Sequence, residues 1–312
     1  LVSRDGSIDW LCWPRFDSGA CFAALLGTPD HGRWRIAPQG EVRATRRRYL
    51  PGTLVLETVF ETDTGSASVT DLMTARLPGI AGARDDTSEL IRIVRGLSGT
   101  VEMRMDLTLR FDYGASVPWV SRVSEVTGAP PEGRCDMPDC VLRAVAGPNM
   151  TTLRTAAPIR GENLSTVADF SVSEGEAMPF VLTYSPSHLP LPDSIDALEA
   201  QVDMEARWRA WSGRCHGAGE WTEAVERSLI TLKALTYHRT GGVVAAPTTS
   251  LPEQLGGVRN WDYRYCWLRD ATLTLLALMN AGYYNEARSW REWLERAIAG
   301  SPAQVQIMYG IA

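Results

Sequence analysis

The chain has 312 residues, of which 45% are hydrophobic and 22% are charged, and its formal net charge is −6 at pH 7. This length allows about two domains with hydrophobic cores of their own, and the composition is that of an ordinary globular protein. The acidic balance argues against nucleic acid as a partner, because phosphate binding needs a basic surface. No run of about 18 apolar residues is present, so we expect neither a membrane-spanning helix nor a membrane partner.

The six cysteines show no C-x-x-C pair and no spacing typical of a disulfide framework. Cys135, Cys140, Cys215 and His216 could be combined into a zinc site, but structural zinc usually has closer, paired ligands. Reduced thiols are the better interpretation, and we expect no metal and no other cofactor. No signal peptide is visible, so the sequence predicts a cytoplasmic protein.

Between residues 33 and 185 the apolar side chains recur with a period of two, which indicates half-buried antiparallel strands. In residues 101–111, VEMRMDLTLRF, every odd-numbered position is apolar and every even-numbered position is polar. Further strands are expected at 53–60, 66–73, 89–97, 162–172 and 178–185. Turn-forming residues separate them and no helix intervenes. The sequence therefore predicts an N-terminal antiparallel β-sandwich over residues 1–190.

The apolar period changes after Pro190 and Pro192. Asp193 is expected to cap a helix over residues 193–214, in which apolar side chains recur at helical spacing. Those side chains are Ile195, Leu198 and Val202. We expect this helix to be a linker that occupies residues 191–216.

Helical signals continue through residues 217–312, with helices expected at 221–239, 271–282 and 285–300. The helix at 271–282 is apolar on nearly all sides, which predicts that other helices bury it. Three helices do not enclose a core, so we expect the natural protein to continue beyond Ala312.

Residues 260–271 read NWDYRYCWLRDA and concentrate rings and charges in one short stretch. An aromatic ring can cover the apolar face of a pyranose, while carboxylates and guanidinium groups can bind its hydroxyls in pairs. The same residues also have a structural explanation, since Asp270 could cap the next helix and Arg269 could pair with it. Composition leaves a sugar subsite and a structural ion pair both open.

Two other groups of aromatic residues need an explanation. Trp10, Trp13, Arg15 and Asp17 could cover the mouth of a pocket, but packing in the sandwich or at a domain interface is favoured. On the linker helix, Trp208 and Trp211 are expected to dock the helix against its neighbours.

The segment VVAAPTTSLPEQ…NWDYRYCWLRDA (243–271) resembles the start of the catalytic domain of glycoside hydrolase family 15, the glucoamylases and their trehalase relatives. LVSRDGSIDWLCWPRFDSGACFAALLG (1–27) resembles the N-terminal, trehalase-like domain of bacterial members, and QIMYGI (306–311) resembles a downstream block. The resemblance implies a β-sandwich, a linker helix and an (α/α)6 barrel. Residues 217–312 would form the first helices of that barrel.

The resemblance also implies roles for individual residues. The family's Trp-x-Arg-Asp motif falls on Trp267, Arg269 and Asp270, which would bind the terminal glucose in subsite −1. Tyr263 matches a ring that lines the same subsite. The family uses two glutamates to hydrolyse with inversion, and both would lie beyond residue 312. No catalytic residue is therefore expected within residues 1–312.

Three carboxylates near the motif were considered as substitutes for the catalytic pair. Asp270 is needed as a hydroxyl acceptor, and a carboxylate paired with arginine is a poor general acid. Glu253 has no evident partner in the sequence, and Asp262 offers no stronger case. None of the three is expected to perform the acid–base chemistry.

The leading hypothesis is the N-terminal part of an exo-acting, inverting α-glucosidase of carbohydrate metabolism, with a small or oligosaccharide α-glucoside as substrate. The alternative is a non-catalytic carbohydrate-binding or scaffolding protein that binds through its sandwich. Glucoamylase and trehalase cannot be separated from this sequence, because they differ at the +1 subsite, which later loops build. The oligomeric state is left open as well.

Overall fold

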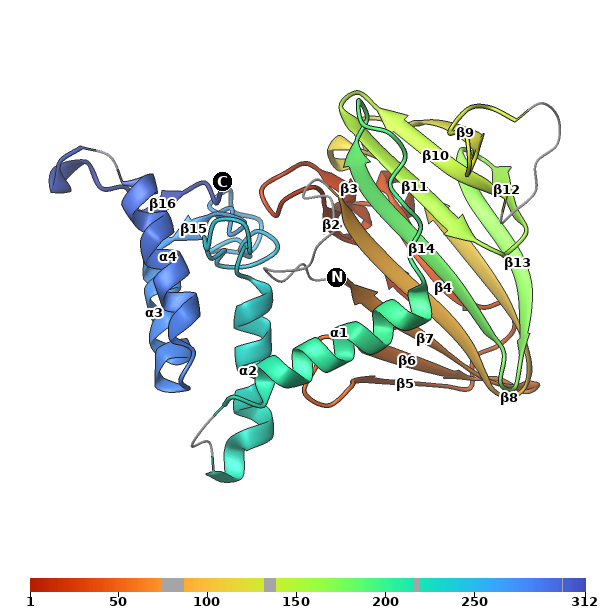
Figure 1. Cartoon of the computed structure of the whole chain (residues 1–312), viewed down its shortest axis with the longest axis horizontal. Helices are drawn as coiled ribbons and strands as arrows, with labels where there is room; N and C mark the ends of the chain where they lie inside the picture. The colour runs from red at the N-terminus through yellow and green to blue at the C-terminus, as the bar shows by residue number, and fades with distance from the viewer. Residues whose placement is uncertain (75–86, 132–138, 216–218, 299) are drawn as a thin grey trace.

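The computed structural model describes residues 1–74, 87–131, 139–215, 219–298 and 300–312. A large antiparallel sheet comes first and a few helices follow it in the chain (Figure 1). This order is consistent with the predicted β-sandwich followed by part of a helical domain.

Within the described residues, twelve strands form one connected hydrogen-bonded system. They are β1 (Ser7–Ile8), β4 (Arg33–Pro38), β5 (Ala44–Tyr49), β6 (Leu56–Glu61), β7 (Gly65–Met73), β8 (Ser88–Thr108), β9 (Trp119–Ser124), β10 (Cys140–Ala146), β11 (Asn149–Thr155), β12 (Ile159–Glu162), β13 (Ser165–Ser173) and β14 (Ala177–Pro186). A separate hairpin joins β2 (Leu11–Cys12) and β3 (Ala20–Phe22).

The longest strand, β8, belongs to two layers of strands. Its first half, up to residue 99, pairs with β7 and β14, whereas residues 100–108 pair with β4 and β13. Glycines permit the crossing, because a Cβ on Gly96 would lie 2.0 Å from the carbonyl oxygen of Ser173 and Gly99 adopts φ +60°. The prediction of two separate strands at 89–97 and 101–111 was wrong, because residues 89–97 and 101–108 both belong to the single strand β8. Each of the two patterns nevertheless belongs to a different layer.

The two layers enclose one hydrophobic core. From the second half of β8 it contains Val101, Met103, Met105 and Leu107. Phe60 and Leu182 reach the same core from the other layer. The predicted apolar face is thus confirmed, but Thr108 and Arg110, which were expected outside, are buried too. Arg110 tolerates burial because its guanidinium donates to the carbonyl oxygens of Leu109 and Leu164.

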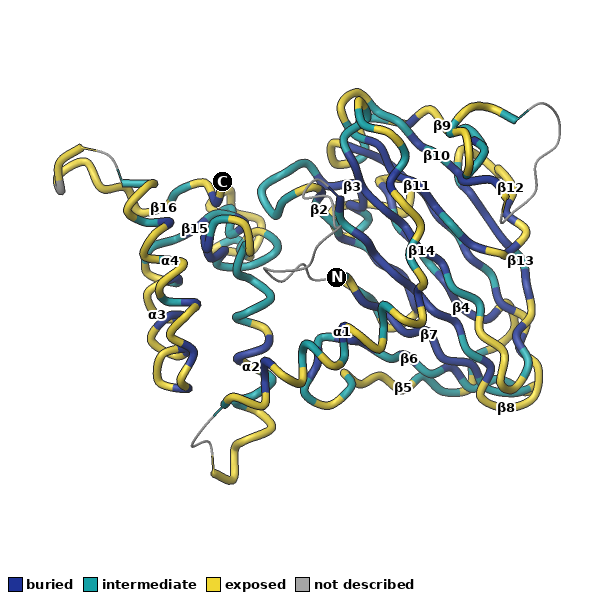
Figure 2. The backbone as a smooth tube through the Cα atoms, in the orientation of Figure 1, coloured by how far each residue is buried: buried dark blue, intermediate teal, exposed yellow. Residues whose placement is uncertain are grey.

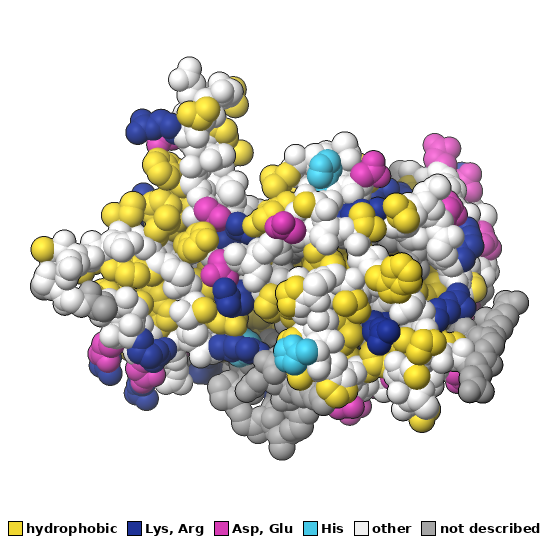
Figure 3. Space-filling view, turned by 90° about the horizontal axis from the view of Figure 1, so that it is seen from above, with side chains coloured by type: hydrophobic (Ala, Val, Ile, Leu, Met, Phe, Trp, Pro, Cys, Tyr) yellow, Lys and Arg dark blue, Asp and Glu magenta, His cyan; other side chains and the backbone are white. Residues whose placement is uncertain are grey.

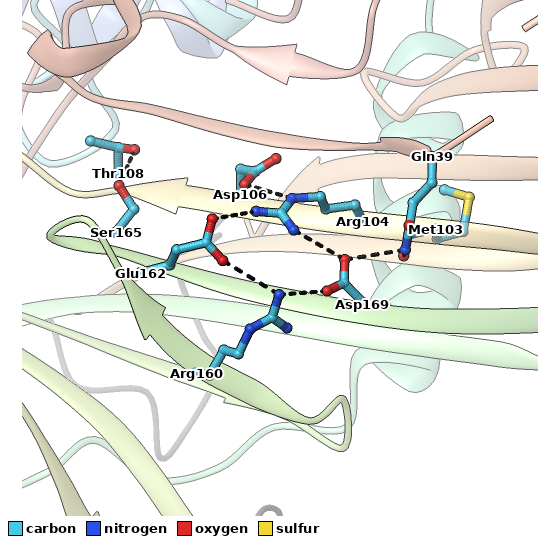
Figure 4. Close-up of polar contacts among 9 residues, drawn as sticks. All are labelled: Gln39, Met103, Arg104, Asp106, Thr108, Arg160, Glu162, Ser165 and Asp169. Carbon is cyan, nitrogen blue, oxygen red and sulfur yellow. Dashed lines mark hydrogen bonds and ion pairs between the residues drawn. The ribbon is translucent and has the colours of Figure 1, made fainter. Parts of the chain in front are cut away.

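The opposite side of the same β8 segment carries a network of ion pairs (Figure 4). Arg104 donates to Asp106, Glu162 and Asp169, and Arg160 donates to the last two as well. These side chains are partly exposed, so each pair contributes only about 0–1 kcal/mol. The network identifies the solvent side of this layer.

The α-helices of the described residues are α1 (Ala197–Ser212), α2 (Thr222–Ala234), α3 (Leu268–Asn280) and α4 (Tyr284–Ala297). Helix α1 lies against the sheet, where Ala197 and Met204 pack on Ile91 and Ile93 of β8 (Figure 1). It leads to α2 and then to the antiparallel pair α3 and α4, away from the sheet (Figure 1).

The start of α1 differs from the prediction. Asp196, not Asp193, is the N-cap, and its carboxylate accepts bonds from the amides of Leu198 and Glu199 at 2.8 and 2.9 Å. Leu198 and Val202 face solvent, and the buried side is formed by Ala197, Met204 and Trp211.

The later helices also differ from their predicted forms. Helix α2 ends at Ala234, well before Arg239, because the chain turns and Tyr237 N donates to Gly242 O. Helix α3 is not buried on all sides, since α2 and α4 pack on only part of it. Its exposed apolar side chains are Leu273, Leu276 and Met279. Exposed positions recur along α3 in Figure 2, and hydrophobic side chains are visible on the helical part in Figure 3.

Cys140 is disulfide-bonded, so the prediction of reduced thiols was wrong at this residue. The other cysteines of the described segments, Cys12, Cys21, Cys215 and Cys266, are free. Two members of the conceivable zinc set, Cys135 and His216, lie outside the described residues. Within the described ranges no cluster of three or more His, Cys, Asp or Glu side chains could hold a metal ion. None of the helices there has the length and apolarity to cross a membrane.

Candidate functional site

The aromatic segment forms one arm of a loop, residues 245–265, that we call the aromatic hairpin. Its two arms run antiparallel, with Ala246 N donating to Tyr263 O at 2.9 Å and Ser250 N donating to Trp261 O at 2.8 Å. After the hairpin, β15 (Cys266–Trp267) pairs with β16 (Met308–Tyr309) and leads directly into α3. Helix α3 thus begins at Leu268, three residues before the predicted start, so Asp270 lies in its first turn and is not its N-cap.

Three rings of this segment contact one another. The Tyr263 and Trp267 rings lie 5.7 Å apart at 83°, and the Trp261 and Trp267 rings lie 6.1 Å apart at 75°. Trp267 donates its indole Nε1–H to the carbonyl oxygen of Asp262 at 2.8 Å. Edge-to-face contacts and this bond orient the Trp267 ring, while Tyr263 and Trp267 stay partly accessible to solvent.

Arg269 and Asp270 lie in the first turn of α3 and pair with each other. Arg269 Nη2 lies 3.0 Å from Asp270 Oδ2, and two further contacts at 3.2 Å make the pair bidentate. The bonds and charge of Asp270 raise the pKa of Arg269, and a hydrogen bond with the Tyr263 side chain adds to that rise. A carboxylate at this helix end is also favoured by the positive end of the helix dipole.

The structure thus brings the four predicted residues together as a chain of neighbours. Trp267 contacts Tyr263, and Arg269 binds Asp270 in the first turn of α3, which begins directly after Trp267. The guanidinium side chain is 69% exposed and the carboxylate side chain 30% exposed. Rings with accessible edges beside an accessible donor–acceptor pair can bind a polyhydroxylated ring.

The remaining carboxylates of the aromatic hairpin have arginine partners as well. Asp262 Oδ2 lies 2.7 Å from Arg264 Nη2; burial alone would raise the pKa of Asp262, but the bonds and charge of Arg264 lower it. Glu253, for which the sequence offered no evident partner, accepts a bond from Trp261 Nε1 and lies 3.5 Å from Arg259. The lowered pKa makes Asp262 a poor proton donor.

Arg264 is a residue whose importance the sequence did not reveal. Its side chain is 9% exposed and points toward the N-terminal strands. The guanidinium donates to the carbonyl oxygen of Ser18 at 3.0 Å and lies over the rings of Trp10 and Tyr113, at 5.9 and 5.4 Å. These partners are far away in the chain, so no local pattern could have identified them.

The two other aromatic groups pack as expected. Trp13 belongs to the sandwich core, while Trp10 donates to the carbonyl oxygen of Pro247 in the aromatic hairpin, which confirms the interface role. On α1, Trp211 stacks on Tyr283 with ring centroids 4.2 Å apart, and Trp208 packs against both the sheet side and the helix side. The docking role predicted for these tryptophans is confirmed.

Comparison with known proteins gives two family matches. Residues 219–312 match the family described as "Glycosyl hydrolases family 15", and residues 1–127 match "Trehalase-like, N-terminal". The aromatic hairpin and α3 fall within the first match, and the strands from β1 to β9 fall within the second.

Curated relatives cover the whole chain. A trehalase of Mycolicibacterium smegmatis is 35% identical over 334 residues, covering 100% of this chain and 48% of the relative. A trehalase of Mycobacterium tuberculosis is 32% identical over 329 residues, covering 100% and 47%. This chain therefore spans about half the length of the curated relatives it matches.

Among solved structures, a "Putative kojibiose phosphorylase from human microbiome" overlaps 63% of this chain and 30% of that protein, with 7% identity and a TM-score of 0.30. That overlap is too low to carry a conclusion about fold or function. The sequence matches are specific, and they include the residues whose geometry is described above. Residues 219–312 are therefore similar to the glycosyl hydrolases of family 15, and residues 1–127 are similar to trehalase-like N-terminal domains.

Proposed function

We propose that this chain supplies the glucose-binding −1 subsite of a glycoside hydrolase that cleaves trehalose or a related α-glucoside. The observation that carries the proposal is that the contacting rings of Tyr263 and Trp267 and the ion pair of Arg269 and Asp270 lie where the aromatic hairpin meets α3. The relatives that cover the chain are named trehalases, which favours trehalose as the first substrate to test.

The proposed subsite divides its work between rings and charges. The Trp267 and Tyr263 rings cover an apolar face of glucose, Arg269 donates to hydroxyl oxygens, and Asp270 accepts from hydroxyl protons. An ion pair as exposed as Arg269–Asp270 contributes little to folding stability. Its two groups can therefore exchange part of their mutual bonding for bonds to a ligand.

We further propose that hydrolysis proceeds with inversion, and that the general acid and the general base come from residues outside 1–312. Such a pair needs a gap of about 6.5–9.5 Å to admit the attacking water. The arginine partner of Asp262 supports this proposal, because its bonds and charge lower the pKa of that carboxyl, and Asp270 and Glu253 likewise have arginine partners. The chain would then comprise a sandwich (1–190), a linker helix (191–216) and the first helices of an (α/α)6 barrel (217–312).

Replacing Asp270 tests the subsite in the full-length natural protein. Asp270→Asn keeps the shape but removes the charged acceptor, which should cost about 2–4 kcal/mol of transition-state binding, or about 30- to 800-fold in kcat/KM. The measurement is glucose release from trehalose and from maltose. The exposed Asp203 of α1 provides the matched control, since Asp203→Asn should leave kcat/KM unchanged.

Either of two results would contradict the proposal. A wild-type protein that releases glucose from no α-glucoside would remove the enzyme assignment and favour a non-catalytic carbohydrate-binding role. An Asp270→Asn variant with wild-type kcat/KM would remove Asp270 from the site. Inversion is tested separately by proton NMR of the first products, which should be one β-glucose and one α-glucose from each trehalose.

A further inference from the structure

The N-terminal strands hold the aromatic hairpin at two points. Trp10 donates its indole Nε1–H to Pro247 O on the first arm at 2.7 Å. On the second arm, Arg264 donates to Ser18 O at 3.0 Å. Both anchors on the sandwich side lie close to the β2–β3 hairpin, so one small part of the sandwich contacts both arms.

Arg264 is enclosed on the side facing the sandwich. Its guanidinium lies over the rings of Trp10 and Tyr113, which are themselves 6.2 Å apart, and one nitrogen approaches Cys12 Sγ at 3.6 Å. A guanidinium in such a position loses water and needs a counter-charge. Asp262 provides it through contacts of 2.7 to 3.2 Å to Nε and Nη2.

Asp262 connects this buried arginine to the proposed glucose subsite. Its carboxylate binds Arg264, while its main-chain carbonyl oxygen accepts the indole Nε1–H of Trp267 at 2.8 Å. Neighbouring residues of an extended segment point to opposite sides. The side chain of Tyr263 therefore points away from those of Asp262 and Arg264, and its ring contacts the Trp267 ring. A shift of Asp262 would therefore move the Trp267 ring and the Tyr263 ring together.

We propose that Arg264 and Asp262 are a positioning pair through which the N-terminal sandwich sets the orientation of the Trp267 and Tyr263 rings. This inference rests on the proposed function, because it concerns the geometry of the same subsite. It makes the β2–β3 region of the sandwich a structural part of the glucose site. Neither residue touches the substrate in this role.

A purely structural role of Arg264 predicts a different result. A residue that only joins two parts of the chain changes the amount of folded protein, whereas a positioning residue changes kcat/KM per folded molecule. A displacement of about 1 Å at the rings can reduce turnover about 100-fold. The experiment therefore has to measure activity per folded enzyme and the coupling of Arg264 to Trp267.

The test is a double-mutant cycle in the full-length natural protein, with Arg264→Met, Trp267→Phe and the combination of both. Arg264→Met should lower kcat/KM on trehalose about 10- to 100-fold, and Arg264→Lys, which keeps one charge for Asp262, should lower it less. In the Trp267→Phe background the same change should cost less than about threefold, because the indole bond to Asp262 is already lost. Arg160→Met is the matched control. Arg160 belongs to the ion-pair network on the solvent side of the sandwich, so this change should leave kcat/KM on trehalose unaltered.

Two results would overturn the inference while the proposed function stands: an Arg264→Met enzyme within twofold of wild type, or equal losses in both backgrounds. If the wild-type protein cleaves no α-glucoside, the proposed function fails. Hydrogen exchange of the Trp267 indole N–H then tests whether Arg264 and Asp262 position the Trp267 ring. Arg264→Met should then speed that exchange at least about tenfold, since the Asp262 carbonyl is no longer held. Unchanged exchange would overturn the positioning role.

Discussion

Glu286 illustrates how one buried charge connects three helices. Its carboxylate accepts a bond from Trp211 Nε1 of α1 at 2.8 Å and lies 3.1 Å from Lys233 Nζ of α2. Arg214 adds a second cation at 3.7 Å. Burial by itself would raise the pKa of Glu286, but the bond from Trp211 and the charge of Lys233 outweigh it and lower that pKa.

The lowered pKa of Glu286 predicts that the free energy of unfolding decreases at acidic pH. A carboxylate with a depressed folded-state pKa stabilises the fold above the ordinary glutamate pKa of about 4.3, and this contribution is lost as the pH falls through the folded-state pKa. Glu286→Gln should therefore lower the free energy of unfolding by about 1–3 kcal/mol at pH 7 and by progressively less below pH 4. Denaturant titrations at several pH values measure this difference.

Glu292 on the same helix gives the control for that measurement. It is exposed, so Glu292→Gln should change the free energy of unfolding by less than about 0.5 kcal/mol. A constant difference between Glu286→Gln and the wild type at all pH values would contradict the role given to the Glu286 charge.

At the scale of the element, α1 shows how a helix boundary is chosen. Asp193 and Asp196 both precede the helical pattern and both have the side chain of a good N-cap. Packing decides between them, because a helix that starts at Ala197 places Ala197 and Met204 on Ile91 and Ile93 of the sheet. With that side of the helix on the sheet, Leu198 and Val202 lie on the exposed side.

The two aspartates make a matched pair of substitutions. Asp196→Ala should destabilise the protein by about 1 kcal/mol, because the amides of Leu198 and Glu199 lose their acceptor. Asp193→Ala should be neutral within about 0.5 kcal/mol, since Asp193 is exposed and precedes the helix. Thermal melting of both variants checks the assignment, and an equal loss at both positions would argue against it.

At the scale of the whole molecule, Trp211 joins the sandwich side to the helical side. It stacks on Tyr283, whose hydroxyl donates to the carbonyl oxygens of Trp211 and Ser212. Ser212 in turn donates to Gly52 O at the sheet. The contacts of Arg264 with the N-terminal strands form a second attachment. The helical part of the chain is thus attached to the sandwich in two separate places.

Removing Trp211 should loosen one of these attachments. Trp211→Ala should cost about 3–5 kcal/mol and increase hydrogen exchange in α3 and α4, because the cavity forms where these helices meet α1. Trp221, which is 67% exposed, is the control, and Trp221→Ala should change neither quantity appreciably. Normal exchange in α3 and α4 of the Trp211→Ala variant would show that this attachment is dispensable.

The candidate site was predictable as far as its residues are local in sequence. Tyr263, Trp267, Arg269 and Asp270 lie within eight consecutive residues, so a sequence motif is enough to group them. Arg264 could not be found in this way, because its partners Ser18, Trp10 and Tyr113 are distant in the chain. An arginine at this position of the motif is compatible with a side chain that faces solvent and with one that faces the sandwich, so the sequence does not distinguish the two.

The sequence alone determined the succession of a sheet and helices, because periods of two and of 3.6 are local properties of the chain. Only the tertiary structure decided that β8 spans both layers and that α1 starts after Asp196. It also decided that Arg264 joins the aromatic hairpin to the sandwich. These outcomes depend on which distant surfaces meet, and the free energy of such contacts is not encoded in any single segment.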